Sequence, residues 1–260
     1  MTKRVAILGC GPAGLMVAHA AQMSDWALQI YSKKQKSQLH GAQYLHQSIP
    51  KIDCGGPNQV SYKLRGTPEE YRRKVYGEVW DGTVSPEDFM EEHSAWDLRS
   101  AYDWLWKQFE PWIVHCDLGL QGYAFNHQQY DLIISTVPRT AWDDDNSHFE
   151  RIQIWALGDK DPDGGLASQP DFTVVCDGTD LCNWYRSAKI FGRSTLEWPY
   201  KPLWLKPPMH GAVIVTKPLR YTGNSAPDFI HLGRYGAWEK GILTSDVFFQ
   251  AMKILAEDRI

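Results

Sequence analysis

Three glycines near the start of the chain have the spacing of a turn that binds the diphosphate of a dinucleotide. Gly9, Gly11 and Gly14 form the pattern GxGxxG within the segment RVAILGCGPAGLM. In such turns the first glycine permits a tight bend, the second lets the backbone approach a pyrophosphate, and the third lets a helix pack on a strand. Free N–H groups at the helix start then hold the phosphates. A tight strand–helix turn without a ligand is the alternative.

The acidic residue that usually holds the adenosine ribose is missing from its place after the second strand. The sequence there reads LQIYSKKQK, with Ser32 followed by Lys33 and Lys34. A serine hydroxyl can bond to a ribose hydroxyl, but without the help of charge. The two lysines leave two other interpretations open. They bind the 2′-phosphate of NADP, or they are solvated side chains after a strand.

The residues around the motif predict one βαβ unit, followed by a longer stretch of mixed elements. A buried strand over 4–8, an apolar helix over 15–23 and a strand over 26–31 form the unit. Residues 33–66 are expected to be irregular because glycines and prolines interrupt them. Helices are expected over 67–79, 85–93 and 94–112, with Thr67, Ser85 and Ser94 as caps. Strands are expected over 113–117, 130–138, 151–157, 171–178 and 211–219, and a strand, a glycine turn and a helix over 228–255.

Composition argues against several classes of function. The 260 residues carry a formal net charge of -4, so no overall positive charge favours nucleic acid as a partner. The five cysteines form no CxxC pair and no zinc spacing, and their odd number predicts reduced thiols in a cytoplasmic protein. No apolar run is long enough to span a bilayer, so no membrane partner is expected. The acidic run at 143–145 is interpreted as a solvated turn, and no metal site is expected.

The form of the glycine motif, GCGPAGL, resembles the N-terminal motif of FAD-binding flavoproteins of the glutathione-reductase-like superfamily. The segments YDLIISTVP at 130–138 and HLGRYGAWEKGILTSDVFFQA at 231–251 resemble parts of its amine oxidase and UDP-galactopyranose mutase group. The resemblance implies FAD as the cofactor and an α/β fold. A Rossmann-like FAD-binding domain with a parallel central sheet is expected over 1–66, 112–140 and 211–260. A helical insert at 67–111 and a smaller α+β region with antiparallel strands at 141–210 are expected to face the substrate.

The resemblance also assigns residues to the flavin. Gly41 and Ala42 are expected to pass close to it, with Gln43, Tyr44 and His46 facing the cofactor or the substrate. The turn at 233–238 is expected beside the pyrophosphate and ribitol, where positive charge stabilises a reduced, anionic flavin. The expected cofactor contacts are Gly9, Gly11, Pro12, Ala13, Gly14, Ser32, Lys33, Gly41, Ala42, Gln43, Gly233, Arg234, Trp238, Leu243 and Thr244, and the catalytic candidates are Tyr44, His46, His210 and Arg234.

Other candidates come from the residue types alone. His210 and His231 are candidate acid–base groups because histidine titrates near neutral pH. Each alone is more often a hydrogen-bonded structural residue. Arg186, Lys206 and Tyr221 are candidates for binding an anionic substrate.

These features lead to one expected function, with alternatives left open. We expect an FAD-dependent oxidoreductase, similar to amine oxidases, that takes a hydride from a C–N or C–H bond of an amine or amino-acid-derived substrate. The flavin carries that chemistry, and the protein orients the substrate and tunes the ring. One alternative is a flavin-dependent lyase or oxidase acting on amino-acid-modified thymidine in phage DNA. Others are a non-redox flavoenzyme similar to UDP-sugar mutases, and an NADP-binding or non-catalytic dinucleotide-binding protein. The expected partner is a small-molecule or modified-nucleotide substrate.

Overall fold

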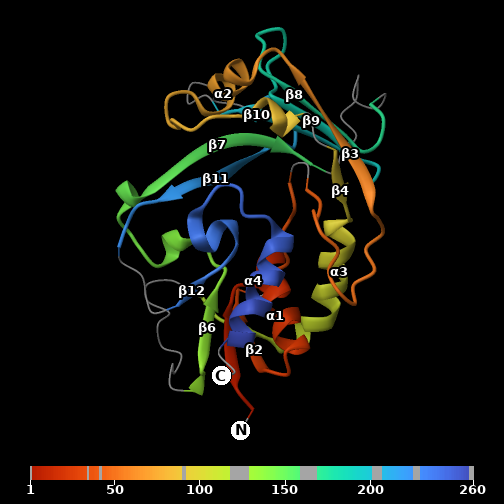
Figure 1. Ribbon diagram of the computed structural model, residues 1–260. Helices are drawn as coiled ribbons and strands as arrows, with labels where there is room; N and C mark the ends of the chain where they lie inside the picture. Colours follow the sequence, from red (N-terminus) through yellow and green to blue (C-terminus); the bar gives the residue numbers. More distant parts are fainter. Residues whose placement is uncertain are drawn as a thin grey trace.

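The computed structural model describes most of the chain in two sheets (Figure 1). Among the described residues, no helix is long and apolar enough to cross a bilayer. The described residues are 2–33, 35–40, 43–89, 92–117, 129–158, 169–200, 207–224 and 229–257.

The first sheet has five parallel strands in the order β12-β6-β1-β2-β5. They are β1 (Arg4–Leu8), β2 (Ala27–Ser32), β5 (Ile113–His115), β6 (Leu132–Ser135) and β12 (Ile230–His231). β1 lies in the centre, and Val5, Ile7 and Leu8 in it have no exposed surface. A parallel sheet buried in this way needs an apolar run in its central strand, and the segment VAIL supplies it. The predicted parallel central sheet is therefore confirmed.

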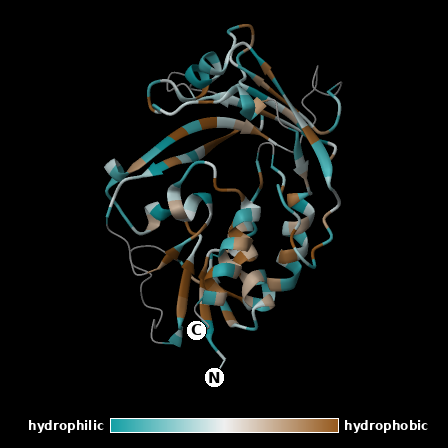
Figure 2. Ribbon diagram, viewed as in Figure 1, coloured by the Kyte–Doolittle hydropathy of each residue, from teal (hydrophilic) through white to brown (hydrophobic). Residues whose placement is uncertain are grey.

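Three helices pack with this sheet in one apolar core: α1 (Pro12–Met23), α3 (Leu98–Phe109) and α4 (Thr244–Glu257). α1 contacts both of the other helices. Its alanines at 18, 20 and 21 are fully buried, and such small side chains allow a close helix–helix approach. Figure 2 shows hydrophobic residues concentrated in the strands of the first sheet, beside these helices. Residues from both ends of the chain thus pack together. We call the first sheet and its three helices the first layer.

The second sheet has seven strands in the order β11-β7-β10-β9-β8-β3-β4, and it lies across one end of the first layer (Figure 1). Its neighbours are antiparallel except for the parallel pair β3 and β8. The predicted antiparallel region is confirmed. The strands are β3 (Asn58–Arg65), β4 (His93–Ala95), β7 (Phe149–Leu157), β8 (Thr173–Asp177), β9 (Arg186–Ile190), β10 (Arg193–Pro199) and β11 (Val213–Tyr221).

One helix, α2 (Pro68–Tyr76), packs on the second sheet through its buried residues Tyr71 and Val75. Thr67 caps it as predicted. The Thr67 hydroxyl accepts a hydrogen bond from the Glu70 N–H, and the Glu70 carboxylate accepts one from the Thr67 N–H. Each side chain thus provides an acceptor for the backbone N–H group of the other residue. The short helical turns are η1 (Pro86–Phe89), η2 (Glu110–Trp112), η4 (Arg139–Ala141), η5 (Asn146–His148) and the π-helical turn η6 (Arg234–Trp238).

The structure differs from the sequence prediction in the strands that join the second sheet. Residues 58–65, expected to be irregular, form β3, where Val60 is buried and Tyr62 and Leu64 are half-buried at alternate positions. The breakers at 55–57 hid this alternation. β11 also belongs to the second sheet, so the expected domain limits at residues 66 and 211 do not follow the sheets.

Two helix starts also differ from the prediction. Ser94 does not cap a helix, because residues 93–95 pair with β3 as β4. α3 starts after Asp97, whose carboxylate accepts a hydrogen bond from the Arg99 N–H at 2.8 Å. The expected helix at 85–93 is reduced to the single turn η1 in the part that the structure describes.

Candidate functional site

The glycine turn between β1 and α1 has the close approaches that its spacing predicts. A Cβ at Gly14 would lie 2.1 Å from the Gly9 carbonyl oxygen, so α1 rests directly on the turn. Gly9 has φ +103, and a Cβ there would lie 2.7 Å from the Thr136 hydroxyl at the end of β6. These two glycines are therefore required by backbone geometry and by packing.

Gly11 differs, because the space beside it is open. A Cβ there would find only the Ser37 hydroxyl, at 3.5 Å. Gly11 is the N-cap of α1, no side chain caps this helix start, and its first turn holds Pro12 and no acidic residue. The partial positive charge of the helix start is therefore left without an anion from the chain, which is the arrangement that phosphate-binding turns share.

The end of β2 presents Ser32 and Lys33 near this turn. The Ser32 hydroxyl accepts a hydrogen bond from the Cys10 thiol at 3.1 Å, so it lies beside the glycine turn. Its own proton is available to a ribose oxygen. Lys33 forms an exposed ion pair with Asp117 at 3.0 Å. Lys34 lies outside the described residues. The ion pair gives Lys33 a carboxylate partner, which weakens the interpretation that it binds a 2′-phosphate.

The C-terminal turn closes over the start of α1. Gly233 has φ +77, and a Cβ there would lie 2.8 Å from the Ala13 Cβ in the first turn of α1. Gly236 approaches the Ser135 carbonyl oxygen at the end of β6, where a Cβ would lie at 2.7 Å. The structure thus brings together Ala13 and Gly233, two of the residues predicted to hold the cofactor.

The other C-terminal candidates lie around this turn. The Trp238 indole N–H donates to the Glu150 carbonyl oxygen at 3.0 Å, so this buried ring anchors the turn to β7. Thr244 is the first residue of α4, and the Leu243 N–H donates to the Asp246 carboxylate at 3.2 Å. Asp246 therefore accepts a hydrogen bond from a backbone N–H group at the start of α4.

The segment after β2 reaches the second sheet. Gly41 and Ala42 lie outside the described residues, and the Gln43 side chain donates to the His40 carbonyl oxygen at 2.8 Å. The Tyr44 and Tyr62 hydroxyls are 3.0 Å apart. The His46 ring stacks on Tyr44, with ring centroids 4.4 Å apart. Tyr44 and His46 therefore lie where the first layer meets β3.

Burial sets the charge state of this aromatic group. It lowers the pKa of His46 to about 4, and the nearby His93 acts in the same direction. Burial also raises the pKa of the Tyr44 hydroxyl above its ordinary range. At neutral pH His46 is therefore neutral, and Tyr44 keeps its proton.

A cavity of 200 Å³ lies between α2, β9, β11 and the C-terminal turn. We call it the cationic cavity, because four of its side chains are basic and none is acidic. Arg186, predicted from sequence as an anion-binding residue, lines it together with Arg234, a predicted cofactor and catalytic residue. Its lining residues are Tyr71, Val75, Tyr76, Tyr185, Arg186, Lys217, Arg234, Lys240 and Gly241.

One buried carboxylate, that of Glu197 on β10, balances part of this charge. It accepts hydrogen bonds from the Tyr185 hydroxyl, from the Arg186 guanidinium and from Lys217 Nζ at 2.7 Å. Burial of Glu197 opposes its ionisation, but Arg186 and Lys217 outweigh that effect and hold its pKa below the ordinary range. Sequence reasoning missed Glu197, Lys217 and Lys240, because they come from separate elements and share no motif.

The two lysines of the cavity are poised near neutral pH. Burial lowers the pKa of Lys217 to about 7, helped by Arg186 and opposed by Glu197. Burial likewise lowers the pKa of Lys240 to about 8, opposed by Asp88 and helped by Arg234. Both lysines would gain protonation from an added negative charge.

The remaining candidates lie elsewhere. His210 is on an exposed turn before β11, and it does not line the cationic cavity. His231 is on β12, and burial, with Arg139 nearby, lowers its pKa to about 4. The Tyr221 hydroxyl donates to the Asp143 carboxylate at 2.7 Å. Lys206 lies outside the described residues.

The acidic run at 143–145 is not wholly a solvated turn, so that interpretation is corrected. Asp143 is buried, and its carboxylate accepts hydrogen bonds from His148 and from Tyr221, both at 2.7 Å. The residue type alone did not reveal this burial, because both hydrogen-bond partners lie further along the chain.

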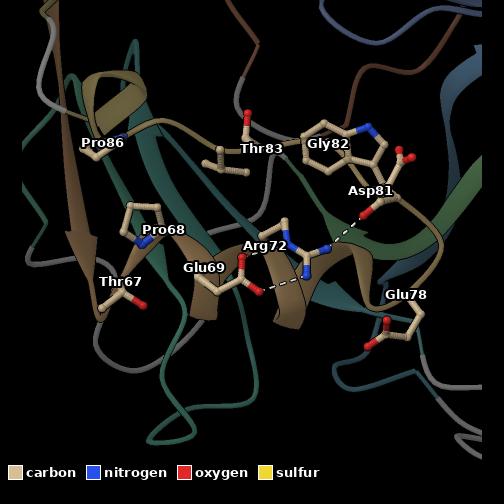
Figure 3. A pocket seen from close by; sticks show the side chains of 11 residues that line it. Thr67, Pro68, Glu69, Arg72, Glu78, Asp81, Gly82, Thr83 and Pro86 are labelled. Carbon is tan, nitrogen blue, oxygen red and sulfur yellow. Dashed lines mark hydrogen bonds and ion pairs between the residues drawn. The ribbon is translucent and has the colours of Figure 1, made fainter.

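A cavity of 530 Å³ at the outer side of α2 is a weaker candidate for the site (Figure 3). The Arg72 guanidinium in it is already paired, because it donates to the Glu69 carboxylate at 2.9 Å and to the Trp80 carbonyl oxygen at 2.8 Å. It is lined by residues of 67–86, and no residue predicted for the site is among them.

Comparisons with known proteins identify the fold. No family model matches the chain, and no curated protein matches its sequence. The tetracycline destructase Tet(51) matches with a TM-score of 0.54 and 9% identity, over 100% of this chain and 82% of that chain. BrvH, a flavin-dependent halogenase from Brevundimonas sp. BAL3, matches with a TM-score of 0.52 and 11% identity, over 98% and 72%. A variant of HpxO from Klebsiella pneumoniae, complexed with FAD, matches with a TM-score of 0.50 and 11% identity, over 99% and 81%.

These matches extend over nearly the whole chain, so they include both sheets. The chain shares the two-sheet fold of these proteins. None of the three is an amine oxidase or a sugar mutase by its description, and they lend no support to a closer resemblance to that group.

Proposed function

We propose that this protein is an FAD-dependent oxidoreductase. The observation that carries the proposal is the approach of Gly233 to Ala13, which brings the C-terminal turn over the start of α1. The βαβ unit and its glycine turn account only for the ADP half of a dinucleotide. Closure by a second turn from the far end of the chain suits contact with the half beyond the pyrophosphate, which in FAD is the riboflavin part. The FAD named for HpxO and the flavin named for BrvH support the same choice.

The residues present fit FAD. The pyrophosphate would lie at the uncapped start of α1, beside Gly11, because the first turn of this helix holds no acidic side chain to repel it. The ribose of the adenosine would lie near the Ser32 hydroxyl. When bound, the flavin would supply two-electron oxidation and reduction.

The chain's own groups have defined tasks in this proposal. Arg234, in the C-terminal turn, would place positive charge near the flavin, which would favour the reduced, anionic ring. His46 is neutral at pH 7, so its ring can form a hydrogen bond with a substrate. Tyr44 stacks on His46 and orients it.

The cationic cavity restricts the amine substrates that the sequence predicts. A free protonated amine would be repelled by the basic side chains of this cavity. An amine that also carries a carboxylate or a phosphate would be attracted. More specifically, we therefore propose that the protein removes a hydride from an amino-acid-derived or otherwise anionic substrate.

The experiment is extraction of the cofactor from protein purified without added flavin, followed by mass analysis. We expect FAD. Anaerobic mixing with amino acids, simple amines and amino-modified nucleosides then shows which class bleaches the bound flavin. Protein that contains no flavin and takes up none on incubation with FAD would rule out the proposal, and binding of NADPH instead would support the sequence alternative.

A further inference from the structure

We propose that the cationic cavity binds an anionic oxygen group of the substrate, a phosphate or a carboxylate. The inference rests on the proposed function, since it makes this cavity the substrate subsite beside the flavin. The cavity is formed by α2, the strands β9 and β11 and the C-terminal turn, which come together only in the folded chain.

The charges of the cavity are out of balance. Arg186, Lys217, Arg234 and Lys240 line it. Glu197 accepts hydrogen bonds from two of the four, Arg186 and Lys217. Arg234 and Lys240 form no ion pair with an acidic residue in the part of the chain that the structure describes. Because like charges gathered in a low-dielectric space repel one another, an added anion would relieve this repulsion.

Two donors of the cavity residues have no acceptor. The Nε atoms of Arg186 and of Arg234 are buried, and neither has a hydrogen-bond partner among the described residues. Burying an N–H group without an acceptor costs free energy, and a charged group makes that cost larger. Guanidinium groups match phosphates and carboxylates in geometry, so these two residues favour a ligand with anionic oxygens in the cavity that they line.

Aromatic side chains hold Lys240 in place, and the volume of the cationic cavity limits the size of the ligand. Lys240 Nζ lies 3.4 Å from the centroid of a Trp80 ring and 4.8 Å from that of Tyr76, so cation–π contacts fix its position. The volume of 200 Å³ equals that of about seven water molecules in the liquid. This space suits the anionic end of a substrate and a few attached atoms, with the rest outside.

The C-terminal turn connects the cationic cavity to the proposed FAD site. Arg234 directly follows Gly233, the residue that approaches α1 over the glycine turn. The Tyr235 hydroxyl donates to the Thr216 carbonyl oxygen at 2.8 Å, which ties the same turn to β11 beside Lys217. A substrate held by its anionic group in the cavity would therefore extend from the turn that closes over the cofactor.

The test uses the FAD-loaded protein and two probes, inorganic sulfate and benzoate, titrated by calorimetry. The first variant is Lys240→Met, and its matched control is Lys107→Met, at an exposed lysine on α3. We expect Lys240→Met to weaken binding of the preferred probe at least tenfold and Lys107→Met to leave it unchanged. Equal binding by the wild type and Lys240→Met would overturn the inference.

A pH series on the wild type keeps the test independent of any variant. Sulfate stays a dianion across this range, so changes in its affinity report on the protein. Because Lys217 and Lys240 lose protons with pKa values of about 7 and about 8, we expect sulfate affinity to fall between pH 6 and pH 9. Among the described residues, the titratable and charged groups that face these lysines are Tyr76, Asp88, Tyr185, Arg186, Glu197 and Arg234. An affinity that does not change with pH would contradict the role of the lysines.

The two probes separate the sources of the anion. Stronger binding of sulfate indicates a phosphate-bearing substrate, and stronger binding of benzoate indicates a planar carboxylate. Protein that holds FAD but binds neither probe overturns the inference and leaves the proposed function intact. The flavin content of the same sample, read from its absorbance, reports on the proposed function separately.

Discussion

The glycine turn and the cationic cavity both place positive charge where an anion would bind, but they do so by different means. At the glycine turn the charge comes from backbone N–H groups at the start of α1, and close packing of glycines creates the room. In the cavity it comes from ionised side chains of α2, β9, β11 and the C-terminal turn, partly balanced by Glu197. The first region therefore tolerates no added atoms at Gly9 and Gly14, and the second tolerates no loss of its carboxylate.

The largest effect is expected from Glu197→Ala in the second region. The change leaves Arg186 and Lys217 buried without their carboxylate, and removal of one partner from such a buried group costs about 3–5 kcal/mol. Urea unfolding measures the loss. The control is Glu150→Ala, which breaks the more exposed pair with Arg220 and should cost less than about 1 kcal/mol. Equal stabilities for the two variants would mean that the network does not hold the second sheet.

A smaller loss is expected from Gly14→Ala in the first region. The new Cβ would lie 2.1 Å from the Gly9 carbonyl oxygen, so the start of α1 must shift. Such overpacking typically costs about 1–3 kcal/mol, although alanine is the better helix former. Gly11→Asn is the control, because the space there is open and asparagine is a good N-cap. Unfolding curves of Gly14→Ala that match the wild type would show that the close approach is unnecessary.

The smallest effect is expected at Asp143, which lies between η4 and η5 and does not line the cationic cavity. Burial of this carboxyl opposes ionisation, but hydrogen bonds from His148 and Tyr221 outweigh it and lower its pKa to about 2. Its contribution to stability is therefore present above about pH 4 and is lost as the pH falls toward 2. Asp143→Asn should cost about 1.5 kcal/mol near pH 6.

The pH profile of that variant checks the sign. Its deficit relative to the wild type should shrink as the pH is lowered from 4 to 2, as measured by thermal unfolding. The exposed Asp144→Asn serves as the control. A deficit that stays constant down to pH 2 would show that the ionised carboxylate is not the stabilising form.

The same contrast explains how much the sequence could predict. The glycine turn was predictable because Gly9, Gly11 and Gly14 are close neighbours whose spacing alone sets the backbone geometry. The parallel sheet was predictable from the βαβ unit over residues 4–31 and from the resemblance to FAD-binding flavoproteins. Trp238 was correctly noted as part of the closing turn, but its bond to the Glu150 carbonyl oxygen depends on where β7 lies.

The cavity could not be assembled in the same way. Arg186 was selected from its residue type, whereas Lys217 and Glu197 acquire their importance only when β11 and β10 bring them together. β3 was missed because the breakers before it outweighed a short alternation of apolar residues, and that error also hid β4 and moved the start of α3. Long-range pairing, which one sequence does not display, decided each of these cases.

The most direct test of FAD binding at the start of α1 is the FAD affinity of Gly11→Asp compared with that of Gly11→Asn. The two side chains have nearly the same size, and both cap a helix well, so the folded protein is kept. Only aspartate places a negative charge where the pyrophosphate would lie. We predict that Gly11→Asp weakens FAD binding about 100-fold relative to Gly11→Asn, as measured by flavin fluorescence on reconstitution. Equal FAD affinity for the two variants would contradict a pyrophosphate at the start of α1.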